Sequence, residues 1–231
     1  MKKLLRLLIL SLFVLFSLQS YSQAKFGVKG GISLTNIVQN FDNSDDEYAT
    51  VPRLLFMVGG VADIGFSDMI SLRPELNISL KGFGVDVKEE YDADKGYDRY
   101  TIAYLDIPVN VALKFGGFQM YAGPYIAFAV WGKNKWDIDD DSGSEDIKFV
   151  MKDVELDEAG DLMNLWRWKR IDYGIGFGAG YKLGPVLLSA GAEIGLANLL
   201  PGIKDMSDFN PDDYKVHNLS MSLTATFFLG K

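Results

Sequence analysis

Residues 70–81, ISLRPELNISLK, alternate without interruption between apolar and polar side chains. The apolar positions share one parity: Ile70, Leu72, Pro74, Leu76, Ile78 and Leu80. Successive side chains of an extended strand point to opposite faces, so this pattern predicts a strand with one apolar and one polar face. Both faces of such a strand must be accommodated by the rest of the chain.

Seven further segments show the same split: residues 25–36, 53–64, 100–115, 118–131, 168–181, 186–198 and 216–229. No amphipathic helix remains in the sequence to cover their apolar faces. The simplest solution is a closed barrel whose apolar side faces lipid and whose polar side faces inward. The predicted fold is therefore all-β, an eight-stranded antiparallel up-and-down transmembrane β-barrel.

The connections between these segments alternate in length along the chain. Short turns are expected at 65–68, 116–117 and 182–185, and long polar loops at 37–52, 86–99, 132–167 and 199–215. The long loops hold 25 of the 31 acidic residues. Short periplasmic turns and long external loops are typical of bacterial outer-membrane barrels, so the pattern predicts the outer membrane of a Gram-negative bacterium.

The N-terminus has the pattern of a secretory signal peptide. Basic residues begin the chain, an apolar run covers residues 4–18, and small residues at Ser20, Ser22 and Ala24 suit cleavage. We predict a cleaved signal over residues 1–24 and a barrel domain over 25–231; an uncleaved membrane anchor is the alternative. No later stretch approaches the roughly 18 apolar residues that a spanning helix needs.

The amino-acid composition excludes some classes of site and of binding partner. The chain has no cysteine, so it has neither disulfides nor thiolate sites. Its formal charge of −8 argues against a nucleic-acid partner, because phosphate backbones require clustered Lys and Arg. No cofactor is expected. The expected partners are outer-membrane lipid or lipopolysaccharide and, during biogenesis, the barrel-assembly machinery.

Two motifs, LRPELNISLKG at 72–82 and YLDIPVNVALKF at 104–115, resemble the small outer-membrane barrels common in Bacteroidetes, often called porin-family or PorT-like. Those proteins show an LQPEL-x-YSQKG-like third strand and a YLEIP-x-x-x-K fourth strand. Arg73 and Asp106 stand where Gln and Glu are usual, and the chain ends on Lys231 instead of an aromatic residue. The resemblance implies a signal-bearing eight-stranded barrel but no shared activity.

Strand parity predicts a charged interior. The inward set is Lys29, Arg73, Glu75, Lys81, Asp106, Lys114, Arg170, Asp172 and Glu193, with Tyr121 and Tyr125 beside it. An eight-stranded barrel has room only for side chains, and buried charges must be paired. We expect a salt-bridged polar plug; a narrow proton or ion path, or a gated pore, is the alternative.

Aromatic residues gather near the strand ends, as in the two belts of membrane barrels. The belt predicted on the long-loop side consists of Tyr100, Tyr125, Trp131, Trp166 and Trp168.

Catalytic signals are weak. The only histidine, His217, lies near Ser220, but a triad is defined by geometry and not by residue types. Asp137, Asp139 and Asp141 miss the glycine and glutamate positions of a calcium-binding EF-hand loop. We therefore expect no enzyme, no metal site, and a structural or surface-interaction barrel. The alternatives are a narrow transport pore, a lipid hydrolase at the membrane rim, and a soluble lipocalin-like binder.

Overall fold

The computed structural model describes residues 24–41, 49–91, 95–153, 167–202 and 214–229. Apart from Ala24, the predicted signal peptide lies outside these residues and stays a prediction. None of the helices in the described ranges is long and apolar enough to cross a membrane.

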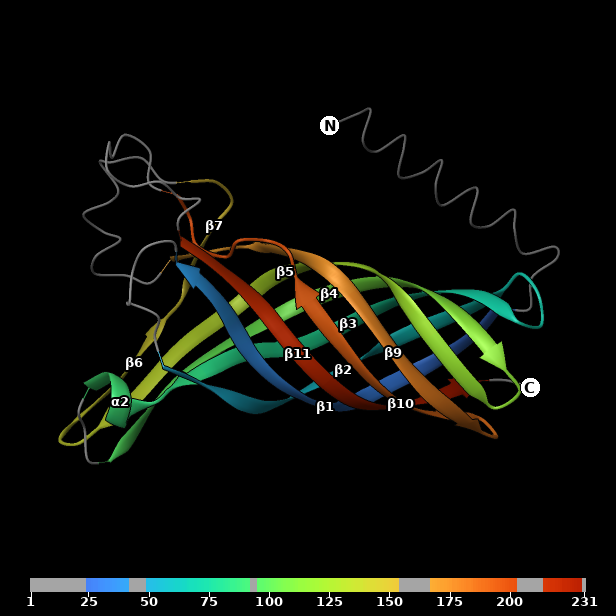
Figure 1. The fold of residues 1–231 in the computed structure, drawn as a ribbon, viewed down its shortest axis with the longest axis horizontal. Helices are drawn as coiled ribbons and strands as arrows, with labels where there is room; N and C mark the ends of the chain where they lie inside the picture. Colours follow the sequence, from blue (N-terminus) through green and yellow to red (C-terminus); the bar gives the residue numbers. More distant parts are fainter. Residues whose placement is uncertain (1–23, 42–48, 92–94, 154–166, 203–213, 230–231) are drawn as a thin grey trace.

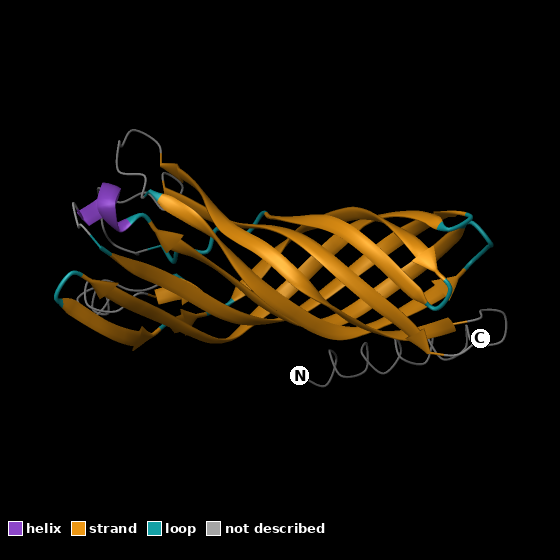
Figure 2. Ribbon diagram, turned by 90° about the horizontal axis from the view of Figure 1, so that it is seen from below, coloured by secondary structure: helices purple, strands orange, loops and turns teal. Residues whose placement is uncertain are grey.

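Eight antiparallel strands of the described chain close into a ring (Figures 1 and 2). They are β1 (Ala24–Phe41), β2 (Thr50–Gly65), β3 (Ile70–Val85), β4 (Gly96–Phe115), β5 (Phe118–Ile138), β9 (Ile171–Leu183), β10 (Val186–Gly195) and β11 (Tyr214–Leu229). Neighbours in the chain pair with one another, β5 pairs with β9, and β11 pairs with β1 to close the ring. The predicted eight-stranded barrel is confirmed.

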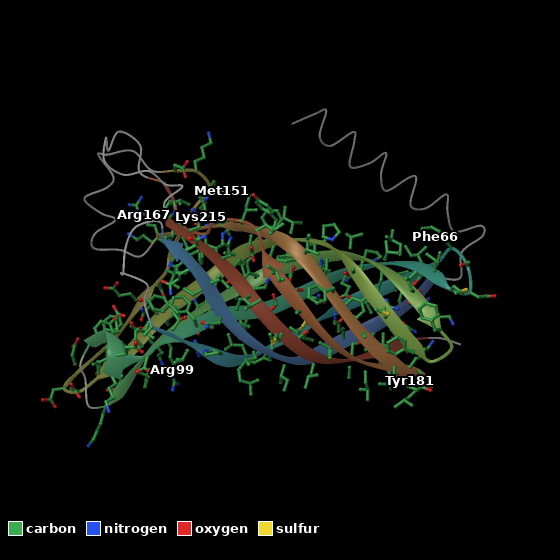
Figure 3. The ribbon with its side chains drawn as sticks, viewed as in Figure 1. Phe66, Arg99, Met151, Arg167, Tyr181 and Lys215 are labelled. Atoms are coloured by element: carbon green, nitrogen blue, oxygen red, sulfur yellow. The ribbon has the colours of Figure 1, made fainter. Side chains whose placement is uncertain are left out.

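The alternation of side chains decides which face of the wall points outward. On β3, Leu76 and Ile78 are 54% and 56% exposed, whereas Arg73 and Glu75 are 3% and 6% exposed. Figure 3 shows carbon-rich side chains projecting from the outer surface of the barrel. A soluble lipocalin-like binder needs a polar outer surface, so this alternative is wrong.

Several strands extend beyond their predicted ends on the long-loop side. β5 continues to Ile138 and returns as β6 (Asp141–Asp146), so the predicted start of the long polar loop at residue 132 is wrong. Buried and exposed residues continue to alternate along this part of β5, where Gly132 and Asn134 are buried and Lys135 is exposed. β10 is shorter than predicted and ends at Gly195.

Three small elements complete the long-loop end. α2 (Val87–Tyr91) interrupts the predicted 86–99 loop. β7 (Lys148–Val150) and β8 (Arg167–Lys169) form a separate parallel pair. Figure 1 shows α2, β6 and β7 at the end of the barrel opposite the short turns.

A bulge in β5 marks the outer limit of the apolar band. Trp131 pairs with Ala103 and Ala129 pairs with Tyr104, which leaves Val130 as the extra residue. Val130 and Trp131 are both exposed, and the outward parity reverses beyond them. The outward positions that follow on β5 carry charges, beginning with Lys133. The lipid boundary therefore lies near Trp131.

The predicted aromatic belt on this side is largely wrong. Tyr100, Tyr125 and Trp168 are only 2%, 3% and 2% exposed because their strand parity directs them into the barrel. For Tyr125 this confirms its other predicted place, beside the inward charges. Trp131 faces outward, and Trp166 lies outside the described residues. Inside the barrel, the rings of Phe83 and Tyr100 stack with centroids 4.6 Å apart. Nearness to a strand end is therefore insufficient to place an aromatic residue at the membrane interface.

Fluorescence quenching tests this placement. In vesicles of brominated phospholipid, a variant retaining only Trp131 should be strongly quenched, because that indole is 48% exposed on the outer wall. A variant retaining only Trp168 should be quenched little, with its indole 2% exposed inside the barrel. Stronger quenching of Trp168 than of Trp131 would contradict the assigned orientation of the wall.

Candidate functional site in the barrel interior

The first interior layer lies near the short turns and centres on Asp63. Its carboxylate accepts hydrogen bonds from Arg73 Nη2 at 2.7 Å and Lys114 Nζ at 2.6 Å. Arg73 also donates to Gln119 Oε1 at 2.6 Å. Asp63 is not among the interior charges predicted from the sequence. Its position between the outward residues Ala62 and Ile64 does indicate an inward side chain. Four strands are thus joined across the lumen.

The second layer is a single ion pair. Lys29 Nζ on β1 lies 2.7 Å from Glu75 Oε2 on β3, and their side chains are 11% and 3% exposed. The amide of Asn77 donates to the same carboxylate at 3.1 Å. A buried pair that is also hydrogen-bonded satisfies the condition under which charges are tolerated away from water.

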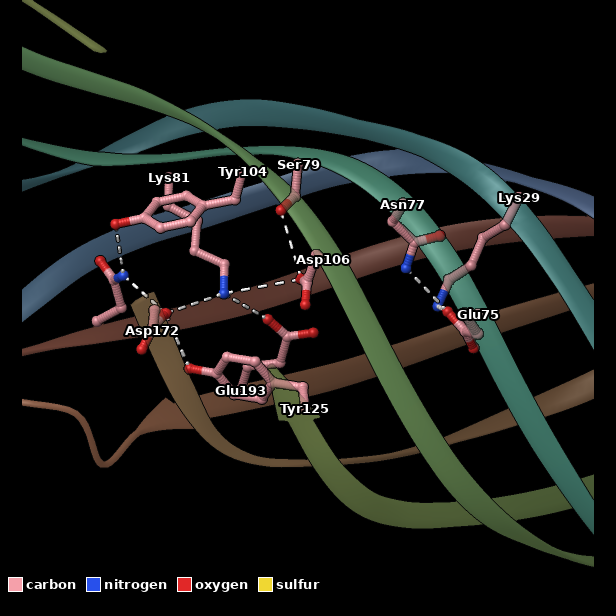
Figure 4. Close-up of polar contacts among 11 residues, drawn as sticks. Lys29, Glu75, Asn77, Ser79, Lys81, Tyr104, Asp106, Tyr125, Asp172 and Glu193 are labelled. Carbon is pink, nitrogen blue, oxygen red and sulfur yellow. Dashed lines mark hydrogen bonds and ion pairs between the residues drawn. The ribbon is translucent and has the colours of Figure 1, made fainter. Parts of the chain in front are cut away.

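The third layer surrounds Lys81, which is 3% exposed. Its ammonium lies 3.1 Å from Glu193, 3.4 Å from Asp172 and 3.7 Å from Asp106 (Figure 4). The same nitrogen lies 4.3 Å from the centre of the Tyr125 ring, within cation–π distance. One cation therefore joins carboxylates from three other strands, β4, β9 and β10.

Neutral donors complete this third layer. Asp172 accepts hydrogen bonds from Asn218 Nδ2 at 2.9 Å and from the Tyr125 hydroxyl at 3.2 Å. Ser79 Oγ donates to Asp106 at 3.4 Å. Oδ1 of Asp106 and Oδ1 of Asp172 are buried without a hydrogen-bond partner among the described residues. Buried acceptors of this kind are usual places for internal water.

Eight of the nine residues predicted for the interior lie in these three layers. Arg170 is the exception, and its placement was wrong. It is exposed at a bend between β8 and β9, which turns its side chain away from the lumen despite its parity with Asp172. Its guanidinium instead lies 5.8 Å from the centre of the Phe149 ring.

An apolar cluster follows the charged layers toward the long-loop end. It is built from aromatic and aliphatic side chains of several strands, and its members include Phe83, Tyr100, Ile102, Trp168, Leu199 and Val216. Close packing of such side chains leaves few voids larger than a water molecule. The interior therefore carries a polar section and an apolar section in series.

The candidate catalytic pair is not assembled. His217 and Ser220 have opposite parity on β11, and Ser220 is 7% exposed inside the barrel. His217 Nδ1 instead lies 2.9 Å from the carbonyl oxygen of Ala197. Among the described residues, no group of three or more His, Asp or Glu side chains could hold a metal ion.

A closed antiparallel ring with an apolar outer wall and a charged interior defines the class of outer-membrane β-barrels. The chain belongs to the outer membrane protein beta-barrel domain family, which matches residues 18–200. The protein is accordingly located in the outer membrane of a Gram-negative bacterium. The narrower resemblance to PorT-like proteins of Bacteroidetes stays a prediction.

Three solved structures are similar in fold. Ail of Yersinia pestis, crystallised with a heparin analogue, is 11% identical with a TM-score of 0.44, covering 89% of this chain and 99% of its own. Neisserial surface protein A is 13% identical with a TM-score of 0.46, covering 88% and 97%. OprG of Pseudomonas aeruginosa is 10% identical with a TM-score of 0.44, covering 91% and 98%. No curated protein matches the chain in sequence.

Proposed function

We propose that this protein is a non-enzymatic outer-membrane barrel with a closed interior and a structural or surface-interaction role. The observation that carries the proposal is the series of ion pairs across the lumen. Lys81 alone contacts charged side chains of three other strands, and Asp63 joins Arg73 to Lys114. Breaking such buried pairs is costly, so the layers favour a plug over an open channel.

The long-loop end supports a surface role. The β5–β6 hairpin extends beyond the apolar band, and its tip exposes the carboxylates of Asp139, Asp140 and Asp141. We expect this acidic end to contact lipopolysaccharide through loosely held divalent cations. Without them, the negative charges of the barrel end and of the lipopolysaccharide would repel one another. Insertion would depend on the barrel-assembly machinery, as expected for a strand-built membrane protein.

Single-channel recording in planar bilayers tests whether the interior is closed. The purified protein should give no single-channel steps, because charged and apolar side chains fill the lumen. The double variant Lys29→Ala with Glu75→Ala removes the ion pair of the second layer. Its conductance is compared with that of the unmodified protein. Regular conductance steps from the unmodified protein would contradict the proposal.

One observation favours a narrow pore as the second candidate. Three carboxylates surround the single cation Lys81, and two of their oxygens are buried without a partner among the described residues. Excess negative charge and internal water together would suit a cation path. Cation-selective conductance steps in planar bilayers would support this candidate over the plug, provided that the conductance is smaller in the variant Glu193→Gln.

A further inference from the structure

The short-turn end of the barrel contains a cavity of about 470 Å³. It is bordered by residues from six strands and a short turn, and its charged lining residues are Lys25, Asp63, Asp68, Lys114 and Lys182. Pockets of this size are large enough for a small organic ligand. The cavity lies above the Asp63 layer, which forms its charged floor.

The lining of this cavity carries three lysines against two aspartates, Asp63 and Asp68, so its positive charge exceeds its negative charge. The Asp63 carboxylate is already shared between Arg73 and Lys114. Lys25 and Lys182 make no ion pair with any residue in the described ranges, and the Lys182 ammonium lies 5.4 Å from the centre of the Phe228 ring. Lys25 and Lys182 therefore line the cavity without an ion-pair partner among the described residues, which leaves their charges available to an anion.

The cavity also lies at a membrane surface. Figure 3 shows Phe66 and Tyr181 at the short-turn end, and these rings are 63% and 53% exposed. Exposed aromatic rings at a strand end are typical of the membrane–water interface. Short turns of outer-membrane barrels face the periplasm, so the cavity opens at the level of the inner-leaflet headgroups.

We propose that this cavity is a binding site for a phosphate group, held by Lys25 and Lys182 with Lys114 beside them. Lysine binds phosphate as a point charge, and basic pockets at membrane faces bind anionic phospholipid headgroups. The phosphate can come from an inner-leaflet phospholipid or from a soluble phosphate in the periplasm. The site is separate from the Lys81 layer and does not depend on whether the barrel conducts.

Titration calorimetry of the full barrel in an uncharged detergent tests the site. The probes are dihexanoylphosphatidylglycerol, inorganic phosphate, and dihexanoylglycerol, which lacks the phosphate. We expect the phospholipid or inorganic phosphate to bind, and the variant Lys25→Gln with Lys182→Gln to bind at least tenfold more weakly. This variant should fold, because neither lysine has an ion pair with a described residue to lose.

The matched control is Lys88→Gln with Lys148→Gln, which removes two exposed lysines from the opposite end and should leave binding unchanged. Binding of phosphatidylglycerol alone assigns the site to a phospholipid, whereas binding of inorganic phosphate as well assigns it to phosphate in general. The proposal is overturned if neither phosphate probe binds. It is equally overturned if dihexanoylglycerol binds as tightly as the phospholipid, or if the Lys25 and Lys182 variant binds like the unmodified protein.

Discussion

Replacing Lys81 with methionine should lower the free energy of unfolding by about 3–5 kcal/mol, the usual cost of breaking a buried ion pair. The ammonium lies within 3.7 Å of Asp106, Asp172 and Glu193. Methionine fills similar space but leaves these carboxylates to repel one another inside the barrel. Urea-induced unfolding of the barrel in phospholipid vesicles measures the loss.

Two further variants make this prediction specific. Lys133→Met removes the 3.7 Å ion pair between Lys133 and Asp146, whose side chains are 35% and 78% exposed. It should lower the free energy of unfolding by less than about 1 kcal/mol. Adding Asp172→Asn and Glu193→Gln to Lys81→Met should recover part of the lost stability, because fewer uncompensated charges remain. An unfolding midpoint unchanged by Lys81→Met would show that the third layer does not hold the barrel together.

Replacing Gly82 with valine should lower the free energy of unfolding by about 1–3 kcal/mol, the range for forcing extra atoms into a packed site. A Cβ at this position would collide with the carbonyl oxygen of Tyr100 on the neighbouring strand. The Gly82 backbone is also fixed from the other side, where its carbonyl oxygen accepts a hydrogen bond from the Thr35 hydroxyl at 2.6 Å. The β3–β4 ladder would therefore have to shift.

Gly60→Val is the matched control for this prediction. Gly60 is exposed, and the nearest atom to a Cβ there is the Gly27 carbonyl oxygen at 4.0 Å. Valine should be tolerated in this position with little change in stability. Heat-modifiable migration in gels and urea unfolding compare the two variants. Equal behaviour of Gly60→Val and Gly82→Val would mean that close strand approach at Gly82 does not limit folding.

The alternation of the strands was sufficient to predict the architecture. In residues 70–81 every second side chain is apolar, and the structure places Leu76 and Ile78 outward and Arg73 and Lys81 inward. A side chain's face follows from parity alone wherever a strand is regular, because the pleat repeats every two residues. For the same reason eight of the nine interior charges were predicted without knowledge of their partners.

Parity fails where the backbone is irregular. The bend at Arg170 turns that side chain out, and the bulge at Val130 reverses the faces of β5 so that Trp131 meets lipid. Neither irregularity leaves a clear pattern in the amino-acid sequence. Tyr100 and Trp168 differ from the prediction for another reason. Their nearness to a strand end favours the membrane interface, but their parity directs them into the barrel.

The sequence by itself determined the number of strands, the lipid-facing wall and the interior position of most charges, because these depend on a local repeat. Only the tertiary structure decided the partners: Lys81 with Glu193, Asp63 with Arg73 and Lys114, and no described ion-pair partner for Lys25 and Lys182 at the short-turn end. Partner choice depends on strand register and on distance across the closed ring. Both are set only when β11 pairs with β1 and residues far apart in the chain face one another.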